Sequence, residues 1–197
     1  RNEMTRKTGL LVEVFEKDLR NANLVDWPAP SLDVELALMR PLITALDAYE
    51  WLLRAAYVHP VDVFCEESEL LDCVRDFVLR AAQTQRLLDR QPTHDMIRFQ
   101  HTKANCIYSV LKLVCTLLDT YHADATVLQH LSSLMPNLMQ VMFLALLAPT
   151  KLELDIVGDP VVSEEVPRQI DTLLRVIIVK HQGLASDVKS FLSQFFS

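Results

Sequence analysis

Residues 94–121 read HDMIRFQHTKANCIYSVLKLVCTLLDTY, and this stretch decides the fold class. From Ile107 to Tyr121 apolar residues recur every three or four positions, which is the period of an α-helix and not the alternation of a strand. Pro92 precedes the stretch, and a break is predicted near His122–Asp124. The period between these two breaks predicts one long helix. A helix of about 25 residues is about 37 Å long.

The same helical period recurs on both sides of this stretch, between prolines and short polar runs. Pro41 and Pro136 lie inside two of the predicted helices, and we expect each proline to kink its helix or split it in two. The helices are predicted over residues of about 2–22, 31–58, 63–90, 94–121, 125–148, 164–182 and 186–196.

Capping residues support these boundaries. Gly183 stands where a left-handed residue would end a helix. The stretch Thr150–Val162 differs, because Lys151–Val157 alternates charged and apolar residues; it predicts a connector across the bundle or a binding loop. Side-chain oxygens that can accept an orphan helix amide occur at Ser31, Asp62, Thr93, Asp124 and Ser163.

The chain is therefore predicted to be all-α and a single domain over residues 1–197. Two architectures remain open: an antiparallel bundle, or a solenoid-like array of about six or seven helices, several of them long. One helix with its loop takes about thirty residues, whereas ordinary repeats fit a helix pair into about 34–47. The first residue is Arg1 and not methionine, as in a piece of a longer protein.

Composition narrows the function classes. The net charge of −7 disfavours nucleic acid, since a phosphate backbone repels an acidic protein that lacks a basic patch. The mean hydropathy of +0.17 indicates either a full core or apolar surface covered by a partner. Four cysteines without zinc-site spacing predict buried, reduced thiols in an intracellular protein, cytoplasmic or nuclear; the alternative is a secreted protein with disulfides. They are Cys65, Cys73, Cys106 and Cys115.

No motif for catalysis, for a metal or for a cofactor is present. The chain has only three glycines, which argues against glycine-rich phosphate loops, and none of its six histidines lies four residues from another on a shared helical face. We therefore expect no enzymatic activity, no metal and no cofactor. An enzyme whose site is assembled from scattered polar residues remains an alternative.

Two apolar features are candidate partner-binding sites. The stretch Leu138–Ala148 is almost wholly apolar, and Met139 and Met142 within it share one helical face with Met135. Methionines adapt to helical ligands, but the same pattern also fits plain core packing or the cavity of a lipid carrier. That stretch is too short to cross a bilayer, which takes about 20 residues.

The second feature is the apolar stripe at the C-terminus. Phe191, Phe195 and Phe196 are its aromatic members, and we assign Asp187, Ser190 and Gln194 among others to the opposite, polar face. The stripe either closes the core or forms a ridge for a partner. Together these features predict a non-catalytic scaffold that binds helical proteins, as a subunit or fragment of a larger intracellular complex.

Overall fold

The computed structural model describes residues 32–59, 70–83, 94–121, 124–147 and 165–195. Within these ranges the secondary structure is helical and contains no strand, which confirms the all-α prediction. The predicted helix over 2–22 and the stretch Thr150–Val162 lie outside the described residues. The helices are α2 (Leu32–Arg54), α4 (Leu70–Gln83), α5 (His94–Thr120), α6 (Ala125–Leu147), α7 (Val166–Lys180) and α8 (Gln182–Phe195).

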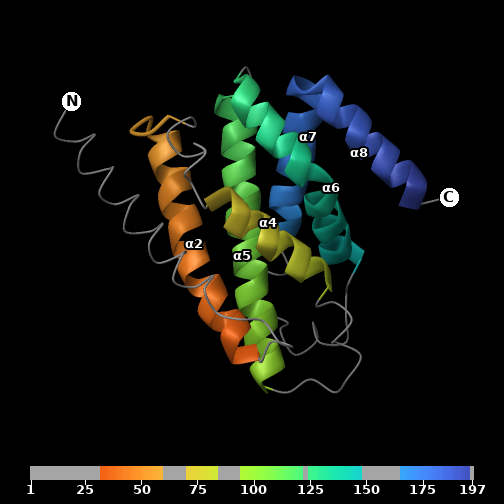
Figure 1. The fold of residues 1–197 in the computed structure, drawn as a ribbon. Helices are drawn as coiled ribbons and strands as arrows, with labels where there is room; N and C mark the ends of the chain where they lie inside the picture. Colours follow the sequence, from red (N-terminus) through yellow and green to blue (C-terminus); the bar gives the residue numbers. More distant parts are fainter. Residues whose placement is uncertain (1–31, 60–69, 84–93, 122–123, 148–164, 196–197) are drawn as a thin grey trace.

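The helices pack in two layers (Figure 1). In one layer α5 lies between α2 and α7; in the other, α6 lies between α4 and α8. Successive described helices therefore alternate between the layers, and each packs against the next helix of its own layer. Stacked helix pairs of this kind are the organisation of an α-solenoid. Of the two architectures that the sequence left open, the structure shows the solenoid-like array.

α2 and α5 run parallel, and polar contacts fix their register. The contacts, in order along both helices, join Ser109 Oγ to Asp47 Oδ1 (2.8 Å), Thr116 Oγ1 to Glu50 Oε1 (2.9 Å) and Tyr121 OH to Leu53 O (3.1 Å). Because the partners advance together on both helices, the helices point the same way. Burial raises the pKa of the Tyr121 phenol, which keeps its proton for the bond to the Leu53 carbonyl.

The buried residues of α5 face both of its layer neighbours, so this helix forms the centre of the core. Leu111 and Leu118 are fully buried, as are Leu46 and Leu53 on α2 and Leu173 on α7. Each such side chain contributes about 1.5–3 kcal/mol when it leaves water. Apolar burial therefore holds the layer together, while the polar contacts select the register.

The C-terminal end of α5 is capped by side chains from the junction of α7 and α8. The last carbonyls of a helix have no partner within it. His181 Nε2 lies 3.0 Å from the Leu118 carbonyl, and Lys180 Nζ lies 3.0 Å from the Asp119 carbonyl and also pairs with the Asp119 carboxylate. Because a carbonyl only accepts, His181 carries a proton on Nε2. These bonds attach the α7–α8 junction to α5.

Two predicted helix ends can be compared with the structure. Asp124 caps α6 as predicted, since its Oδ1 accepts the amide of Val127 at 3.1 Å. The prediction for Gly183 is wrong: this residue lies inside α8, and the chain breaks at His181 with φ −136° and ψ 78°. The buried His181 is held by the Leu118 carbonyl, so the break needs no left-handed glycine.

Pro41 and Pro136 both lie inside continuous helices, so neither splits its helix in two. Figure 1 shows α6 changing direction partway along its length. Such a bend is expected where a proline removes one backbone hydrogen bond and its ring presses on the preceding turn.

The end of α2 has an unusual residue in the left-handed conformation. Ala56 has φ 57°. Its amide binds the Leu53 carbonyl at 3.1 Å, and the amide of Tyr57 binds the Leu52 carbonyl at 2.9 Å. This pair of bonds is the Schellman motif, in which glycine normally occupies the left-handed position.

We predict that Ala56→Gly stabilises the protein by about 0.5–1 kcal/mol, because glycine has no Cβ to strain in the left-handed region. Urea unfolding of the whole chain measures the change. The matched control is Ala55→Gly, at a residue without positive φ, which should be neutral or destabilising. A loss of stability in Ala56→Gly would contradict the assignment of this cap.

His181→Ala should lower the free energy of unfolding by about 1–3 kcal/mol, because it leaves the Leu118 carbonyl without its donor at a buried site. Lys180→Ala is the matched control. Its side chain is 35% exposed and that of Asp119 is 55% exposed, so we expect a loss under about 1 kcal/mol. Equal losses in the two variants would mean that His181 is not the main cap.

Candidate functional site

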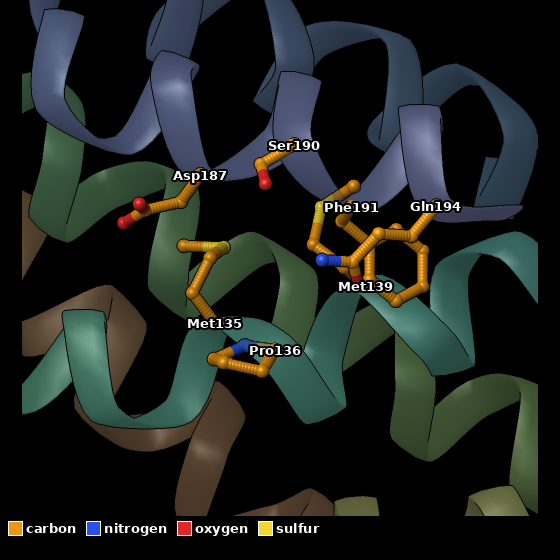
Figure 2. Close-up of a pocket in the computed structure, with 7 residues that line it drawn as sticks. All are labelled: Met135, Pro136, Met139, Asp187, Ser190, Phe191 and Gln194. Atoms are coloured by element: carbon orange, nitrogen blue, oxygen red, sulfur yellow. The ribbon is translucent and has the colours of Figure 1, made fainter.

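The predicted binding residues of α6 and α8 meet at one place, a pocket between these two helices (Figure 2). Its volume is about 230 Å³. From the predicted set, Met135, Met139 and Phe191 line it. The remaining lining residues are Pro136, Asp187, Ser190 and Gln194.

The other three predicted residues, Met142, Phe195 and Phe196, are not among the lining residues of the pocket. Met142 is 2% exposed, belongs to the core together with Met135 and Met139, and does not line the pocket. Phe195 lies at the end of α8, but its side chain is outside the described part, as is all of Phe196. The described portion of the predicted site is therefore the pair of methionines with Phe191.

The two walls of the pocket follow from helical spacing. Met135 and Met139 lie one turn apart on α6 and project from the same side. Asp187, Ser190 and Gln194 repeat every three or four residues along α8 and flank Phe191. Figure 2 shows Asp187 next to Met135 and Phe191 next to Met139, so the two helices run the same way along the pocket.

This arrangement differs from the predicted split of α8 into an apolar face and an opposite polar face. Leu184 and Val188 are buried, and Phe191 packs half-buried against the core. The three polar residues border that stripe and reach the pocket that Phe191 lines, so the same face of α8 is both apolar and polar. Their i, i+3, i+7 spacing beside the phenylalanine is the signal that sequence reasoning missed.

The floor of the pocket is formed by buried thioether side chains: Met135 is 1% exposed and Met139 is 4% exposed. Asp187 is the single formally charged residue among the lining residues. α6 contributes no countercharge, because residues 125–147 contain no Asp, Glu, Lys or Arg. The pocket thus combines a polarisable apolar floor with one carboxylate at its edge.

The pocket lining contains one carboxylate and one hydroxyl. Ser190 is the only hydroxyl among the lining residues, and no histidine stands beside it to act as a base. Across the described ranges no group of three His, Cys, Asp or Glu residues could hold a metal ion. In the same ranges each helix is too short or too polar to span a bilayer.

The described cysteines do not line the pocket. Cys73, Cys106 and Cys115 are buried thiols, as predicted, and Cys65 lies outside the described residues. Burial, and after it the nearby carboxylate of Asp119, raises the pKa of the Cys115 thiol. This thiol stays protonated near neutral pH and is a poor nucleophile.

Sequence reasoning also missed exposed apolar residues on the two outer helices of the α2–α5–α7 layer. On α7, Ile178 is 65% exposed and Val179 is 78% exposed. On α2, Trp51 is 52% exposed and its ring lies 5.6 Å from that of Tyr57. The buried stripe of α7 ends at Ile177. Ile178 and Val179 follow it directly and do not belong to the buried stripe. A run of consecutive apolar residues at a helix end is a signal that the sequence does contain.

The fold and the exposed residues define a class of protein. It is a helical array of stacked helix pairs with exposed apolar residues, Ile178 and Val179, on α7. Comparison with known families agrees with the helical class. The chain belongs to the family described as DNA-dependent protein kinase catalytic subunit, CC1/2, whose model matches residues 16–195. No curated protein and no solved structure matches the chain.

Proposed function

We propose that this chain is a non-catalytic helical scaffold that works inside the cell by packing against other helical protein segments. The observation that carries the proposal is the outer side of α7. Ile178 and Val179 are the most exposed large hydrophobic residues in the described part of the chain. Exposed apolar residues that adjoin each other commonly mark an interaction surface.

The stacking of the array explains why a partner there should be helical. α5 is covered on both sides by helices of its own layer, whereas α7 has such a neighbour only on the α5 side among the described helices. In helical arrays each unit contacts its neighbours, and an end that is not polar favours a further contact. A helix laid against Ile178 and Val179 would continue the packing that α7 makes with α5.

The family supports the non-catalytic part of the proposal. It is named for the CC1/2 region of a kinase catalytic subunit, which is a helical region and not the catalytic domain. We infer that this chain has a supporting role in a protein of that kind, as part of a larger assembly. The net charge of −7 favours a protein over nucleic acid as the partner, because a phosphate backbone repels an acidic chain.

A photo-crosslinking amino acid at position 179 tests the proposal in cells that express the protein containing this chain. We expect crosslinks that peptide mass spectrometry maps to one defined helical segment. The matched control places the same amino acid at Gln129, which is exposed on α6.

Ile178→Ser with Val179→Ser should change the free energy of unfolding by less than about 0.5 kcal/mol, since both residues are exposed. Crosslinks spread equally over both positions, or none at 179, would contradict the proposal.

A further inference from the structure

We propose that the α6–α8 pocket binds one amphipathic helix of a partner protein, which inserts an apolar side chain against Met139 and Phe191 and pairs a lysine or arginine with Asp187. This inference rests on the proposed scaffold function and names a second surface with its own partner chemistry. It concerns the opposite layer of the array from Ile178 and Val179.

The size of the pocket favours a side chain over a free ligand. Sites for small molecules usually measure about 300–1,000 Å³, whereas this pocket measures about 230 Å³. A lipid tail needs more enclosed apolar volume than that. One or two side chains of a protein ligand fill it, and the rest of the ligand lies over the helices.

The shape of the pocket favours a helical ligand. The lining residues of α8 run from Asp187 to Gln194, which is about 10 Å along a helix axis. Met135 and Met139 form a parallel row on α6. Two parallel helices with a groove between them accept the i, i+3 or i+4 side chains of a third helix, and methionine adapts to the shape of what it meets.

The charge of the pocket selects a basic ligand. Asp187 is exposed at one end of the pocket, and the ion pairs of the described residues do not include it. The carboxylate lies at the exposed rim of an apolar floor, where an ion pair adds about 0.2–1 kcal/mol and sets which ligand charge is preferred. An acidic ligand helix would bring like charges together, which is costly at an interface.

The experiment uses the whole chain and a displayed library of helical peptides of about 15 residues, a length at which helices begin to be stable alone. We expect the selected peptides to share an apolar residue with a lysine or arginine one turn away. Their affinity should fall as salt rises, because the ion pair is at the rim.

Three variants make the result specific. Asp187→Lys should weaken binding of the selected peptides by about tenfold, because a lysine at this position repels their basic side chain. A new selection on this variant should favour acidic peptides. Ser190→Trp should block the pocket without unfolding the chain, because position 190 is exposed. The control Lys189→Glu changes an exposed charge of α8 outside the pocket and should leave binding unchanged.

The proposal is overturned if the selected peptides show no basic preference, or if they bind Ser190→Trp as well as the unaltered chain. Binding of a fluorescent fatty acid that Ser190→Trp abolishes, without peptide binding, would also overturn it. Either failure leaves the crosslinks from position 179 unaffected, so it can be told apart from a failure of the scaffold proposal.

Discussion

The fold depends on the pairing of α5 with a neighbour on each side. Its apolar residues fill the space toward α2 and α7, and its part-buried polar side chains find hydrogen-bond partners on α2. The 9% exposed Glu50 receives the hydroxyl of Thr116 at 2.9 Å and the guanidinium of Arg54 at 3.4 Å. At the far end, His181 Nε2 donates to the Leu118 carbonyl at 3.0 Å. These contacts fix which way each neighbour runs.

The second layer packs against the helices of the first. α4, α6 and α8 pack across them as the alternate members of each pair, and α8 starts directly after the capped junction at His181. The position of α8 over α6 then creates the pocket at Met139 and Phe191. The same stacking leaves Ile178 uncovered on the outer side of α7. Both binding proposals are therefore consequences of one packing scheme.

Much of this could be predicted from sequence, because a helical period is local. The long helix of α5 and the cap at Asp124 are examples, and the methionines and Phe191 were identified separately. Their meeting in one pocket was not, since it depends on how α8 lies over α6. The parallel register was also out of reach: Ser109 and Asp47 are 62 residues apart, and a periodic stripe marks a buried face without naming its neighbour. Gly183 shows the same limit, because a distant carbonyl replaces the local signal for a helix end.

Native-state hydrogen exchange tests most directly whether α5 is the element on which the array depends. Amides open with free energies that range from near zero up to that of global unfolding. The buried segment of α5 around Val110 and Leu118 should exchange only through global unfolding, at the free energy that urea unfolding gives, whereas α8 should open at lower cost. If the amides of α5 exchange through local opening as readily as those of α8, the central role of α5 is wrong.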